Sequence, residues 1–114
     1  MSLCLFCRIV AGDIPAAILH RDDDVVAFRD IQPQAPIHVL VVPTRHVVSL
    51  AEAKPEDQAL LGRLLLVARD IASRDGLDAN GYRVVTNCGA DGGQSVAHLH
   101  VHVLGGRPMA WPPG

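Results

Sequence analysis

Three histidines alternate with aliphatic residues towards the end of the chain. Residues 97–104 read Ala-His-Leu-His-Val-His-Val-Leu, and the histidines are His98, His100 and His102. An alternation of period two among aliphatic and β-branched residues is typical of a β-strand. On such a strand the three imidazoles point to one face and the apolar residues to the other, and neighbouring imidazoles start roughly 6–7 Å apart. Three imidazoles at this spacing can share one small anionic group.

A glycine-rich loop, residues 89–95, leads into this strand and ends in the polar side chains of Gln94 and Ser95. A flexible loop beside a histidine-lined strand suits a site that handles phosphate. Alternating histidines also chelate zinc, and a single histidine is often an ordinary surface or hydrogen-bonded core residue. From these residues alone, three interpretations stay open: catalysis on an anionic group, metal binding, or neither.

The chain has 114 residues, of which 49% are hydrophobic and 19% are charged, as is typical of a globular protein. We expect one domain over residues 1–114 with an irregular, proline- and glycine-rich C-terminal tail over residues 105–114. The formal net charge of −2 gives no support for nucleic-acid or electrostatic membrane binding. No apolar run approaches the ~20 residues of a membrane span, and the N-terminus lacks a secretory-signal pattern. Three cysteines do not make a disulfide framework, so we expect a reduced, cytoplasmic location.

Apolar patterning predicts two helices and five strands. The first helix is short and covers residues 4–10, and the second starts near Pro55 and ends near Gly76. The strands are expected at residues 17–20, 25–28, 37–42, 81–87 and 97–104. Most of these strands follow one another through short turns. This order favours an antiparallel sheet with the long helix packed on it, which is an α+β fold.

The long helix is expected to bury one face against the sheet. Five apolar residues recur in it at three- and four-residue spacing, which is the pattern of a buried helix face. They are Leu60, Leu64, Val67, Ala68 and Ile71. Three more residues, Leu61, Leu65 and Ala72, are expected to widen that face.

The histidine stretch resembles the His-x-His-x-His-x-x pattern of the histidine triad (HIT) superfamily. The resemblance covers nearly the whole chain and is to the Hint branch, the purine nucleoside phosphoramidases or histidine triad nucleotide-binding proteins. Its further motifs are residues 14–16, 27–31, 33–36, 91–95, 105–107 and 111–114, together with His38. The resemblance implies a HIT fold, which is a five-stranded antiparallel sheet with one long and one short helix. It also implies a homodimer in which two such sheets form one continuous ten-stranded sheet.

The activity that this resemblance implies is hydrolysis of adenosine 5′-phosphoramidates and aminoacyl-adenylates to AMP through a covalent phosphohistidine. The nearest alternative is a HIT enzyme of the dinucleoside polyphosphate hydrolase branch, against which Trp111 and Ser95 argue. An alternative of another class is a nucleotide-binding interaction module with incidental activity. We expect purine nucleotides, derivatives of AMP, as substrates, and neither nucleic acid nor membrane as a partner.

The resemblance assigns catalytic roles to five residues. His100 matches the nucleophile that attacks the α-phosphorus, which requires a neutral imidazole with one nitrogen free and the other held as a donor. His98 is placed to help fix that tautomer, and His38 matches the fourth histidine behind the triad. His102 can donate to a non-bridging phosphate oxygen, where charge develops, and Ser95 matches the residue on the leaving-group side.

Further residues match the nucleotide contacts of the family. Asp30 matches the ribose-binding acid, since a carboxylate can accept from both ribose hydroxyls. Ile31 and Phe28 would flank the purine, and the alternative for each is ordinary core. Asn87 would face the phosphate, and its alternative is a turn residue at a strand end. The other expected phosphate contacts are Gln94, the loop amides with that of Gly93 among them, Ser95, His100 and His102.

Trp111 is the only tryptophan and lies in the tail among prolines and glycines. A large apolar ring in such a tail is exposed unless it docks somewhere. The resemblance places the tail against the active site of the partner subunit, where Trp111 would shape the leaving-group pocket. The alternative is that Trp111 only anchors the dimer, as interface aromatics often do.

Cys4 and Cys7 form a Cys-x-x-Cys pair, which matches half of a zinc site. Some HIT proteins carry this pair with two histidines, and here His46 and His98 are the candidates that complete a Cys₂His₂ set. Such a zinc would be structural and would tie the N-terminal helix to the strands, with no cofactor required for catalysis. A redox pair is the alternative, although the usual βαβ context is missing.

Overall fold

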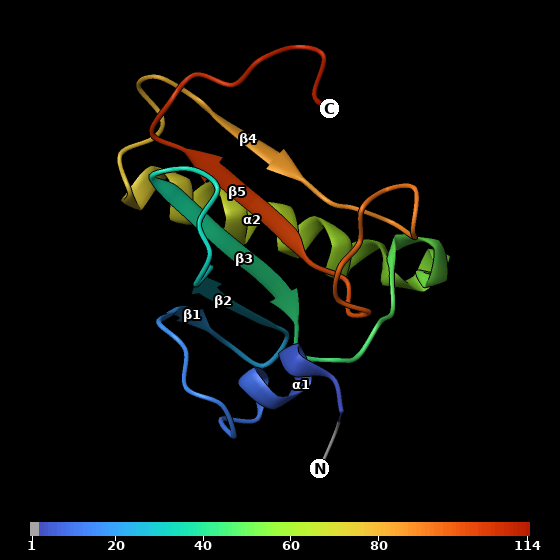
Figure 1. Ribbon diagram of the computed structural model, residues 1–114. Coiled ribbons are helices and arrows are strands. Elements are labelled where there is room, and N and C mark those ends of the chain that lie inside the picture. Colours follow the sequence, from blue (N-terminus) through green and yellow to red (C-terminus); the bar gives the residue numbers. More distant parts are fainter. Residues whose placement is uncertain (1–2) are drawn as a thin grey trace.

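Five short strands pair into one antiparallel sheet in the computed structural model, which describes residues 3–114 (Figure 1). The strands are β1 (Ile18–Arg21), β2 (Val25–Arg29), β3 (Ile37–Pro43), β4 (Tyr82–Val85) and β5 (Val101–Gly105). Their order across the sheet is β1-β2-β3-β5-β4. The first three strands follow one another directly, whereas β5 enters between β3 and β4. The edges of the sheet are therefore β1 and β4.

The long helix α2 (Gln58–Arg74) covers one face of the sheet and runs behind the strands in Figure 1. A 3₁₀ turn (Pro55–Asp57) precedes it. The Asp57 carboxylate accepts from the Lys54 backbone N–H at 2.9 Å, which satisfies a donor at the start of the helical segment. No helix among residues 3–114 is both long and apolar enough to span a membrane.

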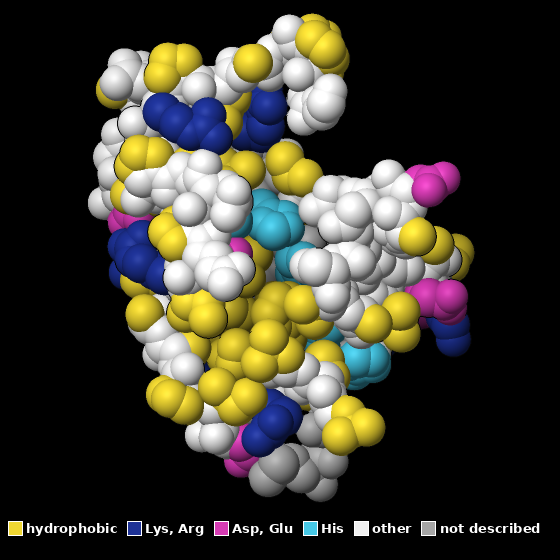
Figure 2. All heavy atoms as spheres, in the orientation of Figure 1, with side chains coloured by type: hydrophobic (Ala, Val, Ile, Leu, Met, Phe, Trp, Pro, Cys, Tyr) yellow, Lys and Arg dark blue, Asp and Glu magenta, His cyan; other side chains and the backbone are white. Residues whose placement is uncertain are grey.

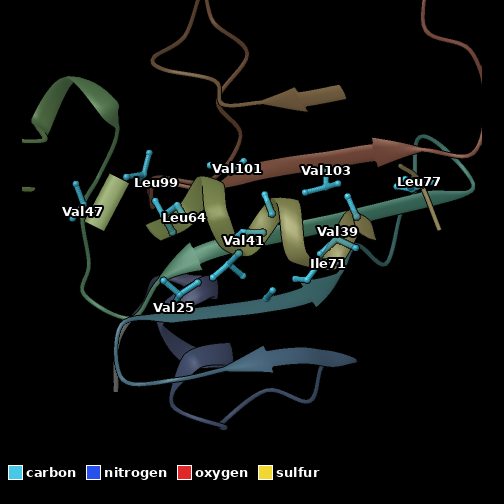
Figure 3. Close-up of a cluster of buried hydrophobic side chains, with 14 residues drawn as sticks. Val25, Val39, Val41, Val47, Leu64, Ile71, Leu77, Leu99, Val101 and Val103 are labelled. Atoms are coloured by element: carbon cyan, nitrogen blue, oxygen red, sulfur yellow. The ribbon is translucent and has the colours of Figure 1, made fainter. Parts of the chain in front are cut away.

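The main core lies between α2 and the sheet (Figure 3). Its buried residues are Val25, Ala27, Val39, Val41, Val47, Leu64, Val67, Ala68, Ile71, Ala72, Leu77, Leu99, Val101 and Val103. Burying one such aliphatic side chain contributes about 1.5–3 kcal/mol. Because Leu99, Val101 and Val103 are buried on the α2 side, the alternating histidines are directed to the opposite face.

The opposite face of the sheet carries the short helix α1 (Leu5–Val10). Phe6 and Ile9 of α1 are buried there together with Phe28 of β2 and Leu40 of β3. The Phe6 and Phe28 rings meet edge to face with centroids 5.5 Å apart, a favoured aromatic geometry. The Cys4 side chain caps the helix by accepting from the Cys7 N–H. This second, smaller core holds α1 against the face to which the histidines point.

The predicted α+β fold, its sheet and both helices are confirmed, with differences at the ends of elements. The strand expected over residues 97–104 begins only at Val101, so His98 and His100 lie in an irregular segment before β5. β5 includes Gly105, so the irregular tail starts one residue later than expected. The strand expected over residues 81–87 ends at Val85. β5 pairs with β3 only from Gly105 back to Val101, although β3 continues to Pro43, because the Leu99 N–H donates to the Val47 carbonyl instead.

The expected helix face is wrong at one position. Leu65 is 54% exposed, whereas the preceding residue, Leu64, is buried. Leu61 packs partly against the core, and Ala72 is fully buried. Because successive residues on a helix are rotated by about 100°, Leu65 lies at the edge of the stripe that faces the sheet.

Candidate active site

A cavity of about 370 Å³ opens on the α1 face of the sheet. Figure 2 shows histidine side chains in the middle of this face, next to a hydrophobic area. The residues that line the cavity are Leu5, Phe6, Ile9, Ile14, Pro15, Ala16, Phe28, Arg29, Asp30, Ile31, Gln32, Leu40, Ser95, Val96, His100 and His102. A mostly apolar cavity with a few polar groups is typical of a small-ligand site.

A hydrogen bond selects the tautomer of the buried His100 ring. Its Nδ1 lies 2.6 Å from the His98 carbonyl oxygen. A carbonyl oxygen only accepts, so Nδ1 carries a proton, and in the neutral ring Nε2 keeps its lone pair. This is the neutral imidazole with one free nitrogen that a histidine nucleophile needs. The group that fixes the tautomer is the backbone of His98, while the His98 side chain lies elsewhere.

His38 and His102 form a hydrogen-bonded chain beside His100. The Gln34 backbone N–H donates to His38 Nδ1 at 3.0 Å, so the ring proton of His38 is on Nε2. That Nε2 lies 2.9 Å from His102 Nδ1 and 3.5 Å from Asp30 Oδ2. His102 Nδ1 is therefore an acceptor, and the proton of His102 is on Nε2. Because His102 lines the cavity, this Nε2–H can donate to a ligand there.

Burial keeps both rings of this chain neutral. Burial, with the neighbouring imidazoles of His100 and His38, lowers the pKa of His102 to about 4. Burial also lowers the pKa of His38, although the Asp30 carboxylate opposes this shift. At neutral pH, His102 is thus an uncharged hydrogen-bond donor.

The expected purine and ribose contacts meet at the cavity, since Phe28, Asp30 and Ile31 all line it. Asp30 Oδ1 accepts from the Gln32 N–H at 2.8 Å, which orients the carboxylate. Phe28 is buried, whereas Ile31 is 93% exposed. An aliphatic side chain so exposed beside an apolar cavity can cover a bound ligand.

Two side chains that were expected to face phosphate instead brace the glycine loop. Asn87 Nδ2 donates to the Gly92 carbonyl at 2.6 Å. The Gln94 side chain accepts from one loop N–H and donates to two backbone carbonyls. Gly93 has a φ of 78°, a conformation that favours glycine. Ser95, at the end of the loop, lines the cavity.

The C-terminal tail is anchored by two arginines. Arg83 of β4 donates to the Ala110 carbonyl at 2.7 Å, and Arg107 donates to the Gln34 carbonyl at 2.9 Å. Trp111, which follows the first anchor, is 82% exposed in the single chain. The tail thus presents a large apolar ring on its surface.

Sequence reasoning missed the wall that α1 contributes to the cavity. Leu5, Phe6 and Ile9 line it, as do residues 14–16 after the helix. The buried Phe6 ring meets His100 edge-on, with centroids 5.1 Å apart. The available signal was the pair Leu5 and Ile9, four residues apart and therefore on one side of a helix.

The four residues expected to bind zinc meet next to this cavity. The ligand atoms of Cys4, Cys7, His46 and His98 all lie within 4.8 Å of one another. Cys7 Sγ is 3.2 Å from His46 Nδ1 and 3.5 Å from His98 Nδ1. Cys4 Sγ is 3.4 Å from His98 Nδ1, and the two Nδ1 atoms are 3.2 Å apart. Zinc bond lengths place tetrahedral ligand atoms about 3.3–3.8 Å apart, so this cluster fits a Cys₂His₂ site.

The ring of His98 is oriented for such a role. It is fully buried, and its Nε2 donates to the Pro43 carbonyl at 2.9 Å. The proton is therefore on Nε2, and Nδ1 presents its lone pair to the cluster, as in metal sites with an oriented histidine. Burial lowers the pKa of His98, which keeps the ring neutral.

A second group, Asp30, His38 and His102, also brings its ligand atoms within 4.8 Å of one another. It fits a metal less well, because the Gln34 N–H occupies the Nδ1 lone pair of His38 and leaves the proton on Nε2. The hydrogen-bonded chain accounts for this arrangement.

The sheet, its two helices and the grouped histidines define a histidine triad fold, and comparison with known proteins agrees. Residues 11–109 match the family model of the HIT domain. A HIT-like protein of Synechococcus elongatus is 54% identical over 110 residues, which are 96% of each chain. The chain therefore belongs to the HIT domain family.

Two solved structures illustrate the similarity. A HIT family hydrolase from Legionella pneumophila has a TM-score of 0.95 and 47% identity, covering 97% of this chain and 99% of its own. A histidine triad nucleotide-binding protein from Candida albicans has a TM-score of 0.82 and 34% identity, covering 96% of this chain and 82% of its own. The fold is thus shared over almost the whole chain.

Proposed function

We propose that this chain is a nucleotide-binding hydrolase that cleaves adenosine 5′-phosphoramidates and aminoacyl-adenylates to AMP. The observation that carries the proposal is the hydrogen bond from His100 Nδ1 to the His98 carbonyl, which leaves Nε2 free beside an apolar cavity. The similarity to one protein named as a hydrolase and to another named as nucleotide-binding supports both parts of the proposal.

The nucleoside half of the substrate is proposed to occupy the cavity. Its volume, about 370 Å³, falls within the range of small-molecule sites. The purine lies between Phe28 and Ile31, and the Asp30 carboxylate accepts from both ribose hydroxyls. The α-phosphate then lies at His100 and His102, on the polar side of the cavity.

The proposed reaction has two displacements at phosphorus. His100 Nε2 attacks the α-phosphorus, a phosphorus–nitrogen bond to His100 forms, and the bond to the leaving group breaks. His102 Nε2–H donates to a non-bridging oxygen, where negative charge develops. Ser95 hydrogen-bonds to the departing amine, to which solvent supplies a proton. Water then attacks the phosphorus, the phosphorus–nitrogen bond to His100 breaks and one water proton passes to solvent, which releases AMP and restores the neutral His100 ring.

The glycine loop completes the phosphate site in this proposal. Backbone N–H groups of the loop, with that of Gly93 among them, donate to phosphate oxygens, as in other loops that bind anions. Asn87 and Gln94 contribute indirectly, because their side chains hold the loop in its conformation.

We further propose a homodimer that forms through β4. Val84 of this edge strand pairs with Val103, whose side chain faces α2, so Val84 lies on the α2 side of the sheet and is 39% exposed. Leu65 of α2 is exposed as well. Pairing of β4 with a second copy would remove the open edge and give one continuous sheet. Trp111 would then reach the cavity of the partner and shape its leaving-group pocket.

We also propose that Cys4, Cys7, His46 and His98 hold a structural zinc. Bound zinc supplies a cross-link between the start of α1 and the segments before α2 and β5, and it takes no part in the bond changes. Cysteine binds zinc as a thiolate, so the site requires a reducing compartment such as the cytoplasm.

The proposed function is tested by comparing kcat/KM for an adenosine phosphoramidate with kcat/KM for a diadenosine polyphosphate. We expect faster turnover of the phosphoramidate. Faster cleavage of the dinucleotide would instead make the chain a dinucleoside polyphosphate hydrolase. Tight binding of AMP with background turnover of both substrates would make it a nucleotide-binding interaction module.

A further inference from the structure

The segment that carries His100 lies outside the sheet ladder. Pairing between β3 and β5 stops at Val101, one residue after His100. Two hydrogen bonds hold the backbone before this point. The Leu99 N–H donates to the Val47 carbonyl at 2.6 Å, and Thr86 Oγ1 donates to the His100 carbonyl at 2.9 Å. The position of His100 therefore depends on contacts other than strand pairing.

His98 joins the cysteine–histidine cluster to His100. Its Nδ1 lies among the cluster's ligand atoms, and its Nε2 donates to the Pro43 carbonyl. Its own carbonyl accepts from His100 Nδ1 at 2.6 Å. One residue thus contacts the cluster through its ring and holds the tautomer of His100 through its backbone.

Two more contacts connect the cluster with the segment that carries His100. His46 belongs to the cluster, and the next residue, Val47, accepts the hydrogen bond from Leu99. The cluster and this bond therefore connect the same two segments of the chain. Cross-linking them at both points restricts the backbone that carries His98.

Phe6 provides the second contact, from α1. It lies between Cys4 and Cys7 in the sequence, and its ring is buried. Its centroid lies 6.0 Å from that of His98 and 5.1 Å from that of His100, edge-on in both cases. The helix turn that presents the two cysteines thus also packs against the nucleophile.

We propose that a metal ion at the Cys4, Cys7, His46 and His98 cluster positions the nucleophile, by fixing the His98 backbone carbonyl that holds the Nδ1 proton of His100. The inference rests on the proposed function for the role of His100. The cluster's cysteines and His46 are positioning residues, and the metal takes no part in bond making or breaking.

Loss of the metal is expected to change the tautomer of His100. Without a metal, the ring of His98 meets α1 and its cap through the edge-on Phe6 ring and through the cysteine sulfurs, which are weak hydrogen-bond partners. The His98 carbonyl can then shift, and the His100 proton can move to Nε2. A ring protonated at Nε2 has no lone pair there and cannot attack phosphorus.

The direct test is long-range ¹H–¹⁵N correlation of the histidine rings, which needs no substrate. Protein loaded with Zn²⁺ should show His100 as a single Nδ1–H tautomer. Protein stripped by a chelator should show a mixture of tautomers, and reloading with Cd²⁺ should restore the single one. An unchanged His100 signal in stripped protein, or no uptake of either metal by reduced protein, would overturn the proposal.

The matched variants are Cys7→Ser, within the cluster, and Cys88→Ser, an exposed cysteine outside it. Cys7→Ser should lose the metal and show the mixed tautomer, with kcat lowered about tenfold and KM changed less than about twofold, as expected for one lost positioning hydrogen bond. Cys88→Ser should match the wild type in both measurements. A lower kcat in Cys7→Ser without a change of tautomer would contradict the inference.

Three other results of these experiments would also decide for or against the positioning role of the metal. If the stripped protein loses its dispersed amide spectrum, the metal holds the whole fold and the positioning role is wrong. If stripping abolishes turnover entirely while the tautomer is kept, the metal acts in the reaction and the proposal is again wrong. A metal-dependent tautomer in a chain that hydrolyses no phosphoramidate would support the positioning inference and refute only the proposed function.

Discussion

The His100 Nδ1–H donates to the His98 carbonyl and leaves Nε2 free at the cavity, so replacing His100 tests the chemistry at the scale of one residue. Replacing His100 by Ala should lower kcat by at least ~10³-fold, the scale expected on losing a covalent nucleophile. AMP binding and the amide spectrum should change little, because the cavity's apolar walls are retained. Single-turnover kinetics and calorimetry measure the two effects. A variant that keeps a tenth of the wild-type rate would mean that another group attacks.

Ser95 lies at the end of the glycine loop and lines the cavity, where it can contact the leaving group. If its hydroxyl assists the departing amine, Ser95→Ala should slow a phosphoramidate with an alkylamine more than an adenylate with p-nitrophenol. The reason is that the poor leaving group depends more on hydrogen bonding as its bond breaks. Equal losses of kcat on the two substrates would assign Ser95 to positioning only.

The buried His38 and His102 make stability depend on pH. An unfolded histidine titrates near pH 6.5, whereas the pKa of His102 in the fold is lowered to about 4 and that of His38 is lowered as well. Between these values the unfolded state binds more protons, so the free energy of unfolding rises with pH. We expect the stability that these neutral rings contribute to be complete above about pH 7 and to be lost as the pH drops towards about 4.

Urea unfolding at a series of pH values measures this dependence. The His102→Asn variant serves as the control, since it removes one of the titrating rings and should flatten the profile between about pH 4 and 6.5. An identical slope in the variant and the wild type would show that the acid loss of stability comes from other groups.

At the scale of elements, the cysteine–histidine cluster lies at the start of α1, and Phe6 and Ile9 are buried along its length. Its 6 residues are too few for a stable isolated helix. Removing the metal should therefore lower the Tm, because metal binding is coupled to folding. Differential scanning calorimetry of Zn²⁺-loaded and stripped protein measures the shift. An unchanged Tm, together with zinc well below one equivalent in reduced protein, would rule out the site.

The elements also show what the sequence can and cannot predict. Period-two alternation correctly predicted the buried side of Leu99, Val101 and Val103, because the rule needs only an extended backbone. The same rule did not predict where β5 begins. Pairing of β5 with β3 stops at Val41, although β3 itself continues to Pro43. The Leu99 N–H donates to the Val47 carbonyl instead, a contact with a distant part of the chain.

Within the site, the sequence predicted which residues come together better than it predicted where their side chains point. The cluster of Cys4, Cys7, His46 and His98 was predicted from the family resemblance together with ligand chemistry, because few residue types bind zinc. The directions of Asn87 and Gln94 were not predicted. Each has both donors and acceptors, and only the folded backbone decides which carbonyls and N–H groups they bond to, in the loop and, for Gln94, at Val48 and Val96.

At the scale of the whole molecule, the proposed dimer uses the edge strand β4 and leaves the opposite edge strand β1 free. Val84→Lys on β4 should give monomers, because a charge is placed where two sheets are proposed to join. The matched control is Ile18→Lys on the opposite edge strand β1, where Ile18 is 37% exposed, much like Val84. Ile18→Lys should stay dimeric. Light scattering with size exclusion measures both masses, and a dimeric Val84→Lys would place the interface elsewhere.

The central claim, a covalent intermediate on His100, is tested most directly by trapping it. The protein is mixed with an adenosine phosphoramidate, quenched within the first turnover under alkaline denaturing conditions, digested and analysed by mass spectrometry. We expect one AMP group on the tryptic peptide of residues 84–114, since the Arg107–Pro108 bond resists trypsin, localised by fragmentation to His100 and missing in His100→Ala. AMP attached to His98, His102 or Ser95, or turnover with no covalent adduct at any time, would contradict it.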